Sequence, residues 1–150
     1  MPNRKIHVAT STFAGALFAS NQAAQQPAVH KLIESIGGTI GGWVGGRLPD
    51  LIEPPTSPNH RGSAHSFAVV GGLIKVGNDS LGTWQERLRE KADELAVQRA
   101  GLPADSLSRP LYALAEVLCR LLAGLLAGLT AGYVTHLMLD AGTPRSLRIV

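Results

Sequence analysis

The stretch Gly37-Gly38-Thr39-Ile40-Gly41-Gly42-Trp43-Val44-Gly45-Gly46 decides the fold that we expect for this chain. Glycine pairs recur every four residues, and on a helix this spacing leaves a flat groove into which another backbone can pack. Each glycine lowers helix propensity by roughly 1 kcal/mol, so such a helix needs a tightly packed partner. The same spacing returns in an apolar run at Gly124, Gly128 and Gly132. We therefore expect the two segments to pack on each other or on a copy of the chain.

Composition favours an all-helical domain over a sheet. The chain has 150 residues, enough for one domain with a buried core, and 45% of them are hydrophobic while only 5% are aromatic. Glycine accounts for 17 residues, and small side chains of this kind favour close helix packing. The β-branched and aromatic alternation of a sheet core is scarce. We predict a single all-α domain over residues 1–150.

The pattern of apolar residues and helix breakers predicts about five helices. Pro27 separates the first helix from the second, and Pro110 lies at the start of the last. Pro49 and the prolines that follow it predict an extended loop after the second helix. The expected helices cover residues 7–24, 28–47, 63–76, 80–100 and 108–139, and the polar region at about 78–108 is interpreted as a helical insertion.

Residues 80–100 are rich in charged side chains. Glu86 and Glu90 are like charges four residues apart, and so are Arg87 and Lys91, so pairing within the helix would not stabilise this segment. We therefore interpret the charges as a solvated helix face. His30, between Val29 and Lys31, is likewise expected at the surface.

Residues 121–139 raise the question of a membrane helix. These 19 residues contain no acidic or basic side chain except His136, and the length is just sufficient to cross a bilayer. Glu116 and Arg120 closely precede the run, and arginines on both sides of it define no orientation. The interrupted apolar run after Lys5 does not predict a signal peptide. Two alternatives stay open: an inner-membrane or membrane-associated protein in contact with lipid, and a soluble cytoplasmic bundle that buries this helix.

The charge and the single cysteine exclude some classes of protein. The net charge is +3 and the pI about 9.4, but no block of lysines and arginines interleaves with aromatic residues. Nucleic acid is therefore not expected as a primary partner. Cys119 has no second cysteine with which to form an internal disulfide.

Histidines and carboxylates gather in the proline-rich stretch from Leu48 to Ser66. The chemically active residues there are Asp50, Glu53, His60, Arg61 and His65. Imidazoles and carboxylates are the usual protein ligands of zinc, manganese and iron, so the stretch indicates a divalent transition metal, with zinc preferred. The alternatives are a turn residue for Asp50, a solvated loop acid for Glu53 and an exposed loop histidine for His60.

A second pair of this kind, His136 and Asp140, lies near the C-terminal end. Residues four apart share one helix face, with about 5–6 Å between their Cβ atoms, and can bind one metal together. The alternative is that Asp140 caps the helix end beside a histidine on an apolar face.

Taken together, these pieces resemble a known family. The order is His7, then Leu48-Pro49-Asp50, then His60-Arg61-x-x-x-His65-Ser66, then Gly132-Tyr133-x-x-His136-x-x-x-Asp140-x-x-Thr143-Pro144. Over nearly the whole chain this is similar to the LexA-binding, inner-membrane-associated family classed as metal-dependent hydrolases. That family is similar in turn to the all-helical zinc-dependent phospholipase C and P1 nuclease group, which hydrolyses phosphodiesters. Many relatives carry Asp-x-Asp-His where this chain has Asp50-Leu51-Ile52-Glu53.

The resemblance implies a metal site and roles for single residues. The candidate ligands are His7, Asp50, His60, His65, His136 and Asp140. Arg61 is implied to contact a phosphate oxygen, and Glu53 to act as a ligand or general base. A metal-activated water would be the nucleophile.

Two functional hypotheses follow. The first is a metal-dependent hydrolase of a phosphodiester or lipid-like substrate. The second is a non-catalytic membrane or assembly protein that holds a structural metal and forms homo-oligomers through its glycine grooves. A coordination position open to water favours the first hypothesis, and a metal saturated by protein ligands favours the second.

Overall fold

The computed structural model describes residues 4–52, 71–72, 75 and 77–141, and every regular element within them is helical. The elements are α1 (Arg4–Gln22), α2 (Ala28–Gly45), the short helix α3 (Leu48–Ile52), the π-helical turn η2 (Gly77–Leu81), α5 (Gly82–Ala100) and α6 (Ser108–Ala141). The prediction of an all-α bundle is confirmed, with helix ends a few residues from those expected. The helix predicted at 63–76 lies almost entirely outside the described residues.

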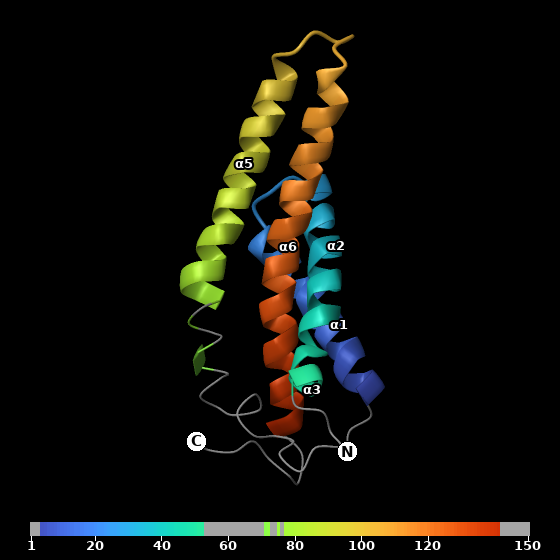
Figure 1. Ribbon diagram of the computed structural model, residues 1–150, viewed down its shortest axis with the longest axis vertical. Helices are drawn as coiled ribbons and strands as arrows, with labels where there is room; N and C mark the ends of the chain where they lie inside the picture. Colours follow the sequence, from blue (N-terminus) through green and yellow to red (C-terminus); the bar gives the residue numbers. More distant parts are fainter. Residues whose placement is uncertain (1–3, 53–70, 73–74, 76, 142–150) are drawn as a thin grey trace.

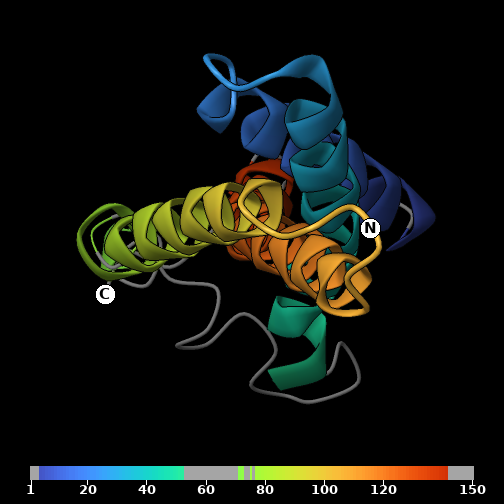
Figure 2. The same cartoon turned by 90° about the horizontal axis from the view of Figure 1, so that it is seen from above.

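The long helices form a bundle around α6. Figure 1 shows α1, α2 and α6 together, with α5 along another side of α6, and in Figure 2 α6 lies between α5 and α2. Gly124 of α6 meets Glu34 of α2, and Gly132 meets Gly42, so these two helices run parallel. The start of α1 lies beside the end of α2, because these two helices are antiparallel.

Glycines allow α2 and α6 to approach backbone to backbone. A Cβ atom on Gly128 would collide with the backbone of Gly38, and one on Gly41 would collide with the carbonyl of Leu125. The same holds along both helices at Gly37, Gly45, Gly124 and Gly132. The prediction that the two glycine segments pack on each other is therefore confirmed within one chain.

The interior of the bundle is made of small and polar side chains, and the large apolar ones lie outside. The buried polar residues are His7, Ser11, Glu34, Gln85, Glu116, Arg120, His136 and Asp140, and most of the buried apolar residues are alanines. The outer faces of α1 and α2 expose Ile6, Phe13, Leu17, Phe18, Val29, Leu32, Ile36, Ile40 and Trp43. An apolar surface of this extent marks a contact with a membrane or with another protein.

The chain after α2 forms the short helix α3 rather than the extended loop expected from Pro49. The N–H of Leu51 donates to the carbonyl of Arg47 at 3.0 Å, which closes a helical turn across Pro49. Proline fits the first turn of a helix because the N–H that it lacks has no partner there. As a result, Asp50 is held next to α6, against which α3 packs.

Within the described part of the chain, α6 is the one helix that is long and apolar enough to cross a membrane. The same length and composition also fit the core helix of a soluble protein. Both alternatives drawn from the sequence are thus compatible with α6 itself.

Candidate functional site

Four of the predicted metal ligands meet at the end of the bundle where α1 begins and α6 ends. Nε2 of His7 lies 3.4 Å from Oδ1 of Asp140. Nε2 of His136 lies 3.5 Å from Oδ2 of Asp140 and 3.6 Å from Oδ1 of Asp50. The two imidazole rings are 4.8 Å apart between centroids. We call these four residues the histidine–aspartate cluster.

The cluster is buried because the helices around it pack closely, with no large side chains between their backbones. His7, His136 and Asp140 have relative exposures of 4%, 2% and 5%. Just after the end of α2, a Cβ atom on Gly46 would collide with the side chain of Ser11 in α1. The small residue at this position therefore lets α1 bring His7 against α6.

The tautomer of His136 follows from its backbone partner. Nδ1 of His136 lies 2.7 Å from the carbonyl oxygen of Gly46, and since a carbonyl oxygen only accepts, Nδ1 carries the proton and donates it. Nε2 is thereby directed at the carboxylates of Asp50 and Asp140. Histidine ligands of metals commonly donate their second ring N–H to a backbone carbonyl in this way.

The nitrogen–oxygen distances inside the cluster are slightly longer than those of a typical hydrogen bond. An N–H···O hydrogen bond is about 2.7–3.2 Å long, whereas the three nitrogen–oxygen distances here are 3.4, 3.5 and 3.6 Å. Nε2 of His7 is buried and has no hydrogen-bond partner among the described residues. The cluster therefore combines two imidazoles with two carboxylates in a buried position.

The electrostatics of the cluster favour the charged form of His136. Burial alone would lower the pKa of His136, because it disfavours the charged ring. The carboxylates of Asp140 and Asp50 oppose this effect and raise the pKa from 6.5 to about 9. His136 thus holds a proton between the two carboxylates at neutral pH.

The remaining predicted site residues lie outside the part of the chain that the structure describes. These are Glu53, His60, Arg61 and His65. Among the described residues, no group of three or more histidine, cysteine or acidic side chains is arranged so that it could hold a metal ion. Asp50, His136 and Asp140 have interactions besides those given above. A complete metal site would therefore need ligands beyond the four that are described.

A second polar cluster lies farther along the bundle, and the sequence patterns did not predict it. Glu34 of α2 is fully buried, and the guanidinium of Arg89 in α5 donates to both of its oxygens at 2.8–3.1 Å. Nη2 of Arg120 lies 2.6 Å from Oδ1 of Asp93. Together with Glu116, Arg99 and His30, these residues form what we call the glutamate–arginine layer.

Two expectations from the sequence are corrected by this layer. The charges of α5 are not all a solvated face, because Arg89, Asp93 and Arg99 reach partners on α2 and α6. His30 is not a surface residue without a partner, since its Nε2 lies 3.3 Å from Oε1 of Glu116.

The sequence feature that could have revealed this layer is the presence of isolated charged residues in apolar helices. Glu34 lies in the glycine-rich helix, and Glu116 lies one turn before Arg120 in an apolar one. Such charges are seldom buried unless they are paired. Their partners could not be assigned from sequence, because Arg89 is 55 residues from Glu34.

Comparison with protein-family models, with curated proteins and with solved structures finds no match for this chain. The two clusters and the surface around them are therefore the features from which a function can be inferred.

Proposed function

We propose that this protein is a metal-dependent hydrolase whose divalent metal, preferably zinc, is held by the histidine–aspartate cluster. The observation that carries the proposal is the ring of His136, which donates from Nδ1 to the carbonyl of Gly46 and presents Nε2 to Asp50 and Asp140. The resemblance to the LexA-binding, inner-membrane-associated hydrolase family supports the same function, and membership of that family is part of the proposal.

The residues of the histidine–aspartate cluster have different roles in the proposed function. A bound zinc ion would supply a Lewis acid and lower the pKa of a bound water toward neutrality. Asp140 lies between the two imidazoles, one carboxylate oxygen near His7 and the other near His136, so it would keep both rings in position. Asp50 would add negative charge from α3 and bind the metal or orient His136.

Further roles are proposed on the resemblance alone. His60 and His65 would complete the ligand set, Glu53 would serve as a ligand or general base, and Arg61 would bind a phosphate oxygen. The proposed substrate is a phosphodiester or a lipid-like molecule.

Metal content tests the proposal directly. The full chain is purified without a metal-chelating tag, supplied with zinc or manganese, and assayed by elemental analysis. We expect about one or more equivalents of metal in the wild type and a loss of it in His136→Ala and His7→Ala, because each variant removes one imidazole ligand. The metal-loaded wild type should then hydrolyse an activated phosphodiester, and the two variants should not.

His30→Ala is the matched control for this experiment. His30 is also partly buried and paired with a carboxylate, but it belongs to the glutamate–arginine layer. It should therefore keep the metal. A wild type that takes up neither metal, or a His30→Ala variant that loses metal together with His136→Ala, would contradict the proposal.

We further propose that the protein contacts membrane lipid through the outer faces of α1 and α2. The exposed apolar side chains there support this localisation, whereas the outward face of α5 is charged. After cell lysis, the chain should sediment with membranes and stay with them through a high-salt wash. Recovery of all of it in the soluble fraction would contradict this part of the proposal.

A second candidate function is a non-catalytic membrane or assembly protein with a structural metal. The same exposed apolar faces favour it, because they would also suit contacts between copies. The glycine stripes of α2 and α6 face each other inside the chain, so such an oligomer would form through the outer faces. X-ray absorption spectroscopy separates the two candidates: a water ligand on the metal favours the hydrolase, and saturation by protein ligands favours the structural role.

A further inference from the structure

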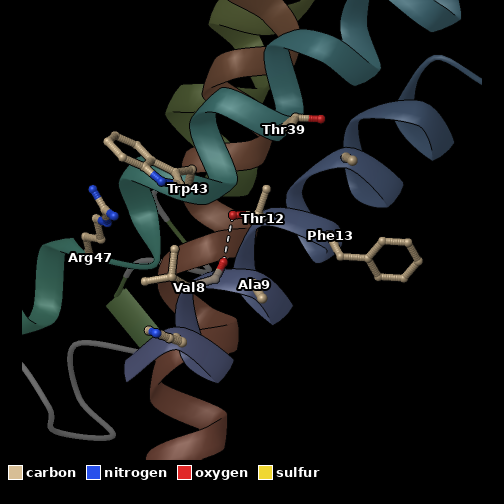
Figure 3. Close-up of a pocket in the computed structure, with 9 residues that line it drawn as sticks. Val8, Ala9, Thr12, Phe13, Thr39, Trp43 and Arg47 are labelled. Carbon is tan, nitrogen blue, oxygen red and sulfur yellow. Dashed lines mark hydrogen bonds between the residues drawn. The ribbon is translucent and has the colours of Figure 1, made fainter. Parts of the chain in front are cut away.

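A groove of about 950 Å³ runs between the outer sides of α1 and α2 (Figure 3). This volume lies in the upper part of the range of about 300–1,000 Å³ that is typical of small-molecule sites. Val8, Ala9, Phe13 and Ala16 from α1 and Trp43 from α2 make most of its lining apolar. The groove opens on the face with the exposed apolar side chains, so an apolar ligand could enter it from a membrane.

One end of the groove is basic. Lys5 lies at the start of α1 and Arg47 just after α2, and because these helices are antiparallel both cations line the same end. The guanidinium of Arg47 lies 3.7 Å from the centre of the Trp43 ring (Figure 3). Nε of Arg47 is buried and has no hydrogen-bond partner among the described residues. The aromatic ring thus holds a guanidinium at this end of the groove.

The two cations of the groove are close in sequence to residues that form or contact the histidine–aspartate cluster. Arg47 directly follows Gly46, whose carbonyl accepts the hydrogen bond from His136. Lys5 precedes His7 by two residues on α1. No residue of the cluster lines the groove, so the groove and the cluster are separate features of this end of the bundle.

We infer that this groove binds an anionic phospholipid, with an acyl chain against its apolar wall and the headgroup phosphate at Lys5 and Arg47. The apolar wall, the charge of the end and the exposed apolar faces on either side argue for this occupant rather than for a soluble anion. The inference goes beyond the proposed function and does not depend on it. Binding itself requires no metal.

The two tryptophans of the chain allow a direct test. Trp43 lines the groove, whereas Trp84 lies on α5 near Arg87. In Trp84→Phe the fluorescence reports on Trp43, and in Trp43→Phe it reports on Trp84. Each variant of the full chain is mixed with vesicles of phosphatidylcholine and phosphatidylglycerol in fixed proportion, with brominated acyl chains placed on one lipid or on the other. The surface charge and the bromine content are the same in both sets.

We expect Trp43 to be quenched more strongly when the bromines are on phosphatidylglycerol than when they are on phosphatidylcholine. Trp84 should show no such difference. Arg47→Gln, made in the Trp84→Phe background, should weaken binding to the anionic vesicles about fivefold, equivalent to about 1 kcal/mol, and remove the preference. Arg47→Lys should restore much of it, since the charge is kept. Equal quenching of Trp43 by the two lipids, or the same preference at Trp84, would overturn the inference.

The lipid measurement is independent of the metal measurement. Quenching is recorded with and without a chelator, and metal content is assayed on the same samples. Lipid preference without metal uptake would refute the hydrolase and keep the groove, while metal uptake without lipid preference would refute the groove and keep the metal site. Unchanged helical circular dichroism in Arg47→Gln shows that any loss of binding does not reflect unfolding.

Discussion

The two polar clusters of the bundle differ in the kind of charged groups that they pair. The glutamate–arginine layer sets three carboxylates, of Glu34, Asp93 and Glu116, against the guanidiniums of Arg89, Arg99 and Arg120. The histidine–aspartate cluster sets two carboxylates against two imidazoles. Arginine keeps its charge at every accessible pH, whereas histidine exchanges its proton near neutrality.

The contact distances are also shorter in the glutamate–arginine layer than in the histidine–aspartate cluster. Arg89 binds Glu34 at 2.8 Å and Arg120 binds Asp93 at 2.6 Å, which are lengths of strong ionic hydrogen bonds. The pairs in the histidine–aspartate cluster are 3.4–3.6 Å apart. The first cluster therefore attaches α5 to α2 and α6, and the second holds two imidazoles beside two carboxylates.

The largest effect is expected when the glutamate–arginine layer loses a cation. Arg89→Met leaves the fully buried carboxylate of Glu34 without its bidentate partner, and loss of one member of a buried ion pair costs about 3–5 kcal/mol. Denaturant-induced unfolding measures the change in the free energy of unfolding. Arg87→Met, on the exposed side of the same helix, is the control and should have little effect.

A double variant sharpens this prediction. Glu34→Gln combined with Arg89→Met removes both charges, so it should be more stable than Arg89→Met alone. If Arg89→Met were as stable as the wild type, the layer would not attach α5, and the contrast between the two clusters would be lost.

A smaller effect is expected at the glycine contact on which both clusters depend. Gly128→Ala places a Cβ atom against the backbone of Gly38, and overpacking of this kind costs about 1–3 kcal/mol. Thermal unfolding should show the loss. Gly101→Ala is the matched control, since the nearest atom to its added Cβ lies at an ordinary 3.6 Å. Equal stability of the two variants would show that the helices can separate without loss.

A change in pH is expected to act on the histidine–aspartate cluster through His136. The folded pKa of His136 is raised to about 9, above the ordinary 6.5 of an unfolded chain. The stabilisation from its protonated form is therefore complete below about pH 6.5 and is lost as the pH rises through about 9. In the metal-free protein the melting temperature should fall more between pH 7 and 10 than it does in His136→Gln.

Added zinc should change the sign of this dependence. Metal binding requires the neutral ring, so the stabilisation by zinc should grow as the pH rises toward 9. Parallel pH profiles of the wild type and His136→Gln, with or without zinc, would show that His136 does not titrate between the two carboxylates.

The local parts of this architecture could be predicted from the sequence. Glycine spacing in residues 37–46 and 124–132 predicted the close contact of α2 and α6, because a repeat of four residues places glycines on one helix face. The same periodicity placed His136 and Asp140 together. His7 and Asp50 were assigned to the same site through a family resemblance, because no periodic pattern connects them with His136 and Asp140.

The sequence predictions were wrong where contacts with other parts of the chain decide the local structure. The charges of α5 have the pattern of a solvated face, yet Arg89 and Asp93 are bound by residues of other helices. Pro49 was expected to hold the chain extended, but a proline also fits the first turn of a helix. In both cases the sequence pattern allows two local structures, and contacts elsewhere in the chain select one of them.

Sequence alone determined that the chain is helical, that two of its helices approach through glycine, and that His136 and Asp140 share one helix face. These properties depend on residue type and on spacing within a single helix. Tertiary structure decided that His7 and His136 face each other, that Glu34 is buried against Arg89, and that the large apolar side chains of α1 and α2 point outward. The reason is physical: periodicity defines the faces of each helix, but the parallel or antiparallel packing of the helices determines which faces meet.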